Sequence, residues 1–198
     1  MIDSKFRHPY QTFILDPLLR KPWILKWHPH ALTGLGLLLG LFCAAFIAAN
    51  YKLLSFCFLS LSGLFDTLDG SLARTQNRSS NRGAVLDIFS DRVVEFAIVM
   101  GLYGAFPEQR AFLCLCMLGS ILLCITSFLV VGIFTQNTSA KSFHYSPGLM
   151  ERTEAFVFFT AMIFFPQSFA PLALTFTLLV TWTGIKRIHD YWCFEGRR

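Results

Sequence analysis

Long apolar runs separated by short polar segments dominate this chain. A membrane-spanning helix needs about 20 predominantly apolar residues, and lipid cannot satisfy the exposed backbone of an open sheet, so such runs predict helices. The runs lie at roughly 31–50, 53–72, 84–105, 111–134, 151–166 and 169–187. The pattern therefore predicts an all-α integral membrane protein with six transmembrane helices.

The first residues have an amphipathic pattern instead. Apolar side chains recur there mainly at helical spacing, between basic residues: Phe6, Tyr10, Phe13, Ile14, Leu18 and Leu19. This is typical of a helix that lies in the membrane interface, and we expect Pro17 to kink or end it. A flexible basic tail is the alternative.

Composition supports the membrane assignment. The chain has 198 residues, of which 54% are hydrophobic and 15% charged, and its mean hydropathy is +0.52. That leaves too little polar surface for a soluble globule. No internal repeat or second domain is visible, so we expect one domain over residues 1–198, with a juxtamembrane segment at 1–28 and a six-helix bundle at 29–192.

Positive charge predicts the orientation. Basic residues cluster before the first run, in the 74–82 loop and at the carboxyl end, which six spans place on one side, and only Lys52 and Arg110 fall opposite. The positive-inside rule then puts both termini toward the cytoplasm. The net charge of +5 fits contact with anionic lipid, and we do not expect a nucleic-acid partner.

Acidic residues interrupt the apolar runs between Asp66 and Asp91. Asp66 and Asp69 are three residues apart and Asp87 and Asp91 four apart, so each pair projects from one helix face. A charge at membrane depth costs at least about 2.5–3.5 kcal/mol, which implies a compensating cation. Carboxylate oxygens suit hard divalent ions, and magnesium or manganese are preferred where phosphates complete the coordination.

Small residues and an arginine accompany these acids. Gly70 and Gly83 lie one turn from Asp66 and Asp87, where the missing side chain lets a ligand or a neighbouring backbone approach. Arg74 falls at the expected end of its helix and is placed to meet an anionic group.

Together these residues read D-x2-D-G-x2-A-R-x8-G-x3-D-x3-D from Asp66 to Asp91. The arrangement resembles the signature of the CDP-alcohol phosphotransferase family (CDP-alcohol phosphatidyltransferases, class I), with every fixed position filled. The alternative is that the acids only cap helices or pair with nearby arginines: Arg78, Arg82 and Arg92.

The resemblance implies a metal-dependent enzyme of phospholipid synthesis. Such an enzyme moves a phosphatidyl group from CDP-diacylglycerol to an acceptor alcohol and releases CMP, using two divalent ions, Mg²⁺ or Mn²⁺. It implies metal ligands at Asp66, Asp69, Asp87 and Asp91, with Asp91 also acting as the base. It implies contacts to the CDP-lipid at Thr33, Gly70, Ala73, Arg74, Ser80 and Gly83.

Two further segments carry the resemblance. The sequence from Pro29 to Thr33 is similar to the family's Pro-Asn-x-x-Thr, with His30 in place of Asn. Residues 151–155 are similar to the Glu-Arg-x-Glu-Arg segment of bacterial phosphatidylinositol-phosphate synthases, but Ala155 replaces the second Arg, and Val130 stands where they carry a basic residue. The resemblance thus implies the reaction but leaves the acceptor alcohol open.

Two side chains are candidates for an acceptor pocket. Glu95 continues the face of Asp87 and Asp91 by another turn, and Arg152 begins the fifth apolar run. For Glu95 the alternative is a structural ion pair with Arg92 or Arg152; Arg152 can equally pair with a neighbouring acid.

Other functions remain as alternatives. One is a CDP-choline- or CDP-ethanolamine-type phosphotransferase that uses diacylglycerol as acceptor. From a different class, an ion-coupled transporter could use the buried acids as a cation path. The expected partners are a CDP-activated lipid, an acceptor alcohol and membrane lipids, and the Phe-rich spans would permit a homodimer.

Overall fold

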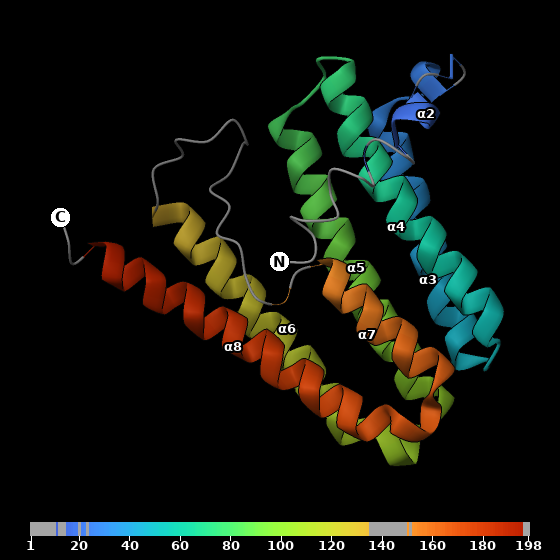
Figure 1. The fold of residues 1–198 in the computed structure, drawn as a ribbon, viewed down its shortest axis with the longest axis vertical. Helices are drawn as coiled ribbons and strands as arrows, with labels where there is room; N and C mark the ends of the chain where they lie inside the picture. The colour runs from blue at the N-terminus through green and yellow to red at the C-terminus, as the bar shows by residue number, and fades with distance from the viewer. Residues whose placement is uncertain are drawn as a thin grey trace. The chain divides into compact units, whose positions relative to one another are not determined.

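The computed structural model describes residues 11, 15–19, 21–22, 24–134, 150 and 152–195. Within this part of the chain every regular element is a helix (Figure 1), which confirms the predicted all-α class. The elements are α2 (Asp16–Leu19), η2 (Ile24–Lys26), α3 (Pro29–Ala48), α4 (Lys52–Thr75), α5 (Asn81–Ala105), α6 (Pro107–Phe134), α7 (Arg152–Phe164), η3 (Pro166–Ser168) and α8 (Phe169–Glu195).

The long helices coincide with the predicted apolar runs. Four segments are long and apolar enough to cross a membrane: Pro29–Ala48, Lys52–Thr75, Pro107–Phe134 and Pro166–Cys193. Helix α5 carries several charged residues and α7 has only 13 residues, so neither meets both criteria of length and composition. Membrane-spanning character is therefore supported for four segments, and the count of six stays a prediction.

Most of the predicted amphipathic helix lies outside the described residues. What is described of this region packs on the bundle: Leu15 and Ile24 form one buried cluster with Leu32 of α3 and with Leu68 and Leu72 of α4. The segment before α3 is therefore attached to α3 and α4 by apolar contact.

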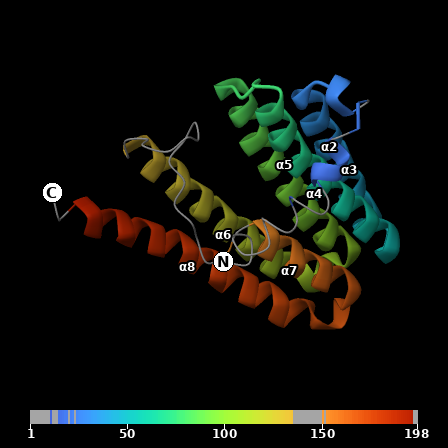
Figure 2. The same cartoon turned by 45° about the horizontal axis from the view of Figure 1, so that its top comes forward.

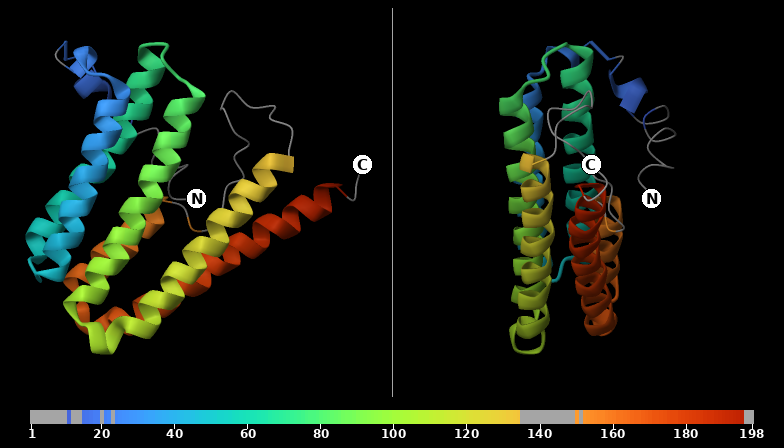
Figure 3. Two further views of the ribbon diagram at one scale, coloured as in Figure 1. Left: turned by 180° about the vertical axis from the view of Figure 1, so that it is seen from behind. Right: turned by 90° about the vertical axis from the view of Figure 1, so that its left-hand side faces the viewer.

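The described residues divide into two compact units: the first lies within Ser4–Phe106 and the second within Pro107–Arg198. In the first unit α3 packs along both α4 and α5 (Figures 2 and 3). Close approach depends on glycine, since a Cβ at Gly101 of α5 would lie 2.5 Å from the backbone oxygen of Ala44 in α3. Small residues allow such close packing of membrane helices.

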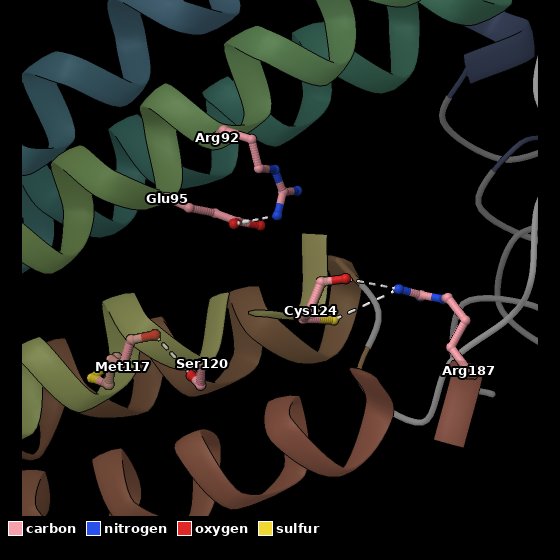
Figure 4. A network of polar contacts seen from close by, with 6 residues as sticks. All are labelled: Arg92, Glu95, Met117, Ser120, Cys124 and Arg187. Atoms are coloured by element: carbon pink, nitrogen blue, oxygen red, sulfur yellow. Dashed lines mark hydrogen bonds and ion pairs between the residues drawn. The ribbon is translucent and has the colours of Figure 1, made fainter. Parts of the chain in front are cut away.

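In the second unit α6 and α8 lie side by side. Arg187 of α8 donates to the backbone oxygen of Cys124 at 3.0 Å (Figure 4). It also donates to the Ser127 hydroxyl at 3.2 Å. Nearer the start of α6, the buried Arg110 lies 4.3 Å from the ring centroid of Phe169. Arginines thus link α6 and α8 at two places along their length.

Candidate active site

Three of the predicted acidic residues lie together in the first unit. Asp66 and Asp69 come from α4 and Asp87 from α5, and one carboxylate oxygen of each lies within 4.8 Å of the others. Oxygens on opposite sides of a magnesium ion are about 4 Å apart. Small side-chain adjustments would therefore bring all three carboxylates onto one ion.

Helix α3, the third long helix of this unit, also contacts the acidic cluster. Thr33 of α3 is 6% exposed and Asp69 is 5% exposed, and the Thr33 hydroxyl donates to Oδ2 of Asp69. Hydrogen bonds to a ligating carboxylate fix its orientation. The structure thus gives Thr33, which the resemblance assigns to the CDP-lipid, a role in orienting Asp69.

Asp91 and Glu95 continue along the same helix. Asp91 is half-buried one turn after Asp87 and lies outside the group of three, so its metal and base roles stay predictions. Glu95 forms an ion pair with Arg92 at 2.6 Å (Figure 4). Pairing with Arg92 is one of the two structural alternatives to an acceptor role for Glu95.

The end of α4 positions Arg74. Asn77 adopts a left-handed conformation with φ 53°; its N–H donates to the oxygen of Arg74 at 3.1 Å, and the N–H of Arg78 donates to that of Ala73 at 2.8 Å. This is the hydrogen-bond pattern of a Schellman cap. The helix therefore ends in a defined turn immediately after the predicted Ala73–Arg74 pair.

The Arg74 side chain lies back along its own helix. Its Nη2 donates to the Ser71 hydroxyl at 3.0 Å, and a Cβ at Gly70 would lie 3.7 Å from its Nη1. Gly70, Ala73 and Arg74 therefore occupy the turn directly after Asp69. The role of Ser71 was missed from sequence, although its spacing of three residues from Arg74 is a usable signal.

Two other predicted site residues, Ser80 and Gly83, have structural roles at the start of α5. Ser80 is the N-cap, and its hydroxyl accepts from the N–H of Gly83 at 3.1 Å, which is a standard stabilising cap. A Cβ at Gly83 would lie 3.3 Å from Cε1 of His30, so this glycine makes room for the α3 histidine. The resemblance assigns Ser80 and Gly83 to the CDP-lipid, and that assignment stays a prediction.

Arg152 is the first residue of α7, in the second unit. Its guanidinium lies 5.6 Å from the ring centroid of Phe156 one turn later. This contact lies within α7, and the acceptor role of Arg152 stays a prediction.

The signature and the clustered carboxylates define a class of protein. The chain belongs to the CDP-alcohol phosphatidyltransferase family, whose model matches residues 26–185. The matched range contains all four signature acids and most of the described helices.

Several known proteins are similar over most of the chain. The inner membrane protein YnjF of Escherichia coli is 32% identical, with 86% of this chain and 84% of YnjF covered. The bifunctional IPC transferase and DIPP synthase of Aquifex aeolicus is 30% identical; the match covers 86% of this chain and 40% of that protein. The phosphatidylinositol phosphate synthase of Corynebacterium glutamicum is 27% identical, with 79% and 71% covered.

Solved structures share the fold. The crystal structure of the Mycobacterium tuberculosis phosphatidylinositol phosphate synthase with CDP-DAG bound matches with a TM-score of 0.73 at 22% identity, over 90% of this chain and 94% of that one. The same synthase in complex with manganese and citrate matches with a TM-score of 0.72 at 22% identity, over 90% and 89%.

Proposed function

We propose that this protein is a membrane transferase of substituted phosphate groups that moves a phosphatidyl group from CDP-diacylglycerol to an acceptor alcohol. The acceptor oxygen forms a bond to the phosphorus that carries the lipid, and the bond from that phosphorus to CMP breaks. The observation that carries the proposal is the group of Asp66, Asp69 and Asp87 oxygens within 4.8 Å of one another, set in the complete signature of this family.

The same group supports a metal requirement. Three carboxylates from two helices, one of them 5% exposed, form an all-oxygen donor set, which fits Mg²⁺ or Mn²⁺. We assign Asp66, Asp69 and Asp87 as ligands and place Asp91 with them to complete a site for two ions. Bound ions would neutralise the pyrophosphate and stabilise the departing CMP.

The remaining residues bind and orient the substrates. Arg74 pairs with a phosphate of the CDP-lipid, since a guanidinium matches phosphate oxygens in two parallel hydrogen bonds. Asp91 takes the proton of the acceptor hydroxyl. The other proposed CDP-lipid contacts are Thr33, Gly70, Ala73, Ser80 and Gly83. Arg152 and Glu95 are each proposed to contact the acceptor.

The placement in the membrane belongs to the same proposal. Helices α3 to α8 form six spans of a single domain, preceded by an interfacial amphipathic segment, with both termini and the acidic cluster toward the cytoplasm. The distribution of basic residues supports this orientation. We also expect a homodimer.

The test is CMP release by purified protein in detergent, with CDP-diacylglycerol, divalent metal and one acceptor at a time. The panel contains glycerol 3-phosphate, inositol, inositol 1-phosphate, serine and a phospholipid with a free hydroxyl. We expect CMP with one acceptor and its loss in Asp91→Asn.

The alternatives give different results with the same purified protein, assayed in detergent or reconstituted into proteoliposomes. Product formed only from CDP-choline or CDP-ethanolamine with diacylglycerol would identify the other donor class. Cation flux in proteoliposomes without any CMP release would favour the transporter.

A further inference from the structure

A side chain at the end of α4 makes a long-range contact that the signature does not explain. Gln76 follows the last residue of α4, and its Nε2 donates to the backbone oxygens of Leu25 at 2.9 Å and Trp27 at 3.2 Å. Both amide protons are therefore used. These bonds tie the end of α4 to the segment just before α3.

The same segment contacts α4 on the other side of Arg74. The buried Ile24 packs in the cluster that contains Leu72. In addition, the Ser71 hydroxyl lies 3.5 Å from Oε1 of Gln11. The segment before α3 thus contacts α4 both before Arg74, at Ser71 and Leu72, and after it, at Gln76.

These contacts on both sides of Arg74 matter because arginine has a long, flexible side chain. Arg74 is exposed, and a long side chain at a helix end loses rotamer freedom when it binds a ligand. Its guanidinium is oriented through Ser71 at 3.0 Å, one turn back on the same helix. An α4 terminus that frays would move both groups, so fixing the turn lowers the entropic cost of ordering Arg74.

We propose that Gln76 is a positioning residue: by joining the end of α4 to the carbonyl groups of Leu25 and Trp27, it holds Arg74 in place for the nucleotide-lipid phosphate. The inference rests on the proposed function, in which Arg74 contacts the CDP-lipid. A contact made equally to bound substrate and transition state changes KM and leaves kcat nearly constant. Gln76→Leu should therefore raise KM for CDP-diacylglycerol by about tenfold, because small misplacements of binding groups have effects of this order or larger.

The experiment measures KM and kcat for CDP-diacylglycerol, together with CDP affinity by titration calorimetry, in five proteins. They are the wild type, Gln76→Leu, Gln76→Lys, Arg74→Ala and the double variant Arg74→Ala with Gln76→Leu. Gln76→Lys is the rescue, since an ammonium group can donate to both carbonyl oxygens. It also removes Oε1 of Gln76, which is buried with no hydrogen-bond partner among the described residues. Thermal unfolding in detergent, run in parallel, reports on the fold.

We expect Gln76→Leu to bind CDP about tenfold more weakly, Gln76→Lys to stay near the wild type, and Gln76→Leu to add nothing in the Arg74→Ala background. A purely structural role would instead lower the unfolding temperature and activity equally in both backgrounds, and that result would overturn the inference. Unchanged KM and CDP affinity in Gln76→Leu, with Arg74→Ala impaired, would overturn it too. Wild-type protein that neither binds CDP nor releases CMP would overturn the proposed function itself.

Discussion

At the scale of single residues, the two signature glycines differ in what an added side chain would meet. Among the described residues, a Cβ at Gly70 would meet only Nη1 of Arg74, at 3.7 Å, which is an ordinary contact. A Cβ at Gly83 would crowd His30 at 3.3 Å. The fold therefore explains Gly83 in part, whereas the contacts around Gly70 leave its proposed role toward the CDP-lipid as the reason to test.

Replacing Gly70 should separate stability from binding. Alanine is favoured over glycine inside a helix by about 0.5–1 kcal/mol, so Gly70→Ala should unfold at the same or a slightly higher temperature. Its KM for CDP-diacylglycerol should rise, because the added methyl group would enter the space that we propose the nucleotide occupies.

Gly119→Ala is the matched control, because no atom of the described residues lies within 4 Å of its added Cβ. It should keep the wild-type KM. Equal KM values for Gly70→Ala and Gly119→Ala would show that Gly70 does not face the ligand.

The Thr33 hydroxyl should matter for metal affinity. Thr33→Val keeps the shape of the side chain but removes its hydrogen bond to Asp69, and loss of such a supporting contact costs about 10–100-fold in metal affinity. The measurement is the Mn²⁺ concentration that gives half-maximal CMP release. Thr33→Ser keeps the hydroxyl and should stay close to the wild type; if Thr33→Val requires no more Mn²⁺ than Thr33→Ser, the orienting role is wrong.

At the scale of helices, apolar runs predict the elements well but their ends less well. The run at 84–105 corresponds to α5, which begins earlier, at Asn81, because Ser80 caps a polar first turn. The run at 151–166 becomes the shorter α7, Arg152–Phe164, because Pro166 disfavours helix at the residue before it. Apolar residues continue through this break, so hydrophobicity alone does not reveal it.

Packing between α3 and α5 gives a stability prediction. Gly101→Ala would place a Cβ 2.5 Å from the backbone oxygen of Ala44, a clash that no side-chain rotation can relieve. Overpacking of this kind typically costs about 1–3 kcal/mol, so the variant should unfold at a clearly lower temperature in detergent.

Gly104→Ala is the comparison on the same helix, since within the described part of the chain its Cβ would meet only the Ala48 Cβ, at 3.4 Å. It should lose little stability. If the two variants unfold at the same temperature, the described contact between α3 and α5 is wrong.

For the molecule as a whole, the sequence predicts site residues best where they belong to one motif with fixed spacing. The acids at Asp66, Asp69 and Asp87 could be predicted because they belong to one motif at fixed intervals. The bond from Thr33 to Asp69 joins residues 36 apart, and that from Gln76 to Leu25 joins residues 51 apart. Such contacts depend on how helices pack, which no local pattern encodes.

The proposed orientation can be tested with single cysteines in a background where the other cysteines are replaced by alanine. Cys193 is exposed near the end of α8, and the six-span topology puts it on the cytoplasmic side. A membrane-impermeant maleimide should therefore label it only after the membrane is permeabilised.

Glu108→Cys, at the start of α6, lies on the opposite side in this topology. It should be labelled in intact cells. The reverse pattern for the two sites would contradict the orientation.

If the carboxylate cluster makes this protein a metal-dependent phosphatidyltransferase, CMP release must depend on both the metal and Asp69. The most direct test is the rate of CMP release from CDP-diacylglycerol by wild type, Asp69→Asn and the exposed-surface control Asp190→Asn, with Mn²⁺ and after chelation. We predict that chelation abolishes the wild-type rate and that added Mn²⁺ or Mg²⁺ restores it. Asp69→Asn should lose at least about 10²-fold, while Asp190→Asn keeps the full rate. CMP release that survives both chelation and Asp69→Asn would contradict the account.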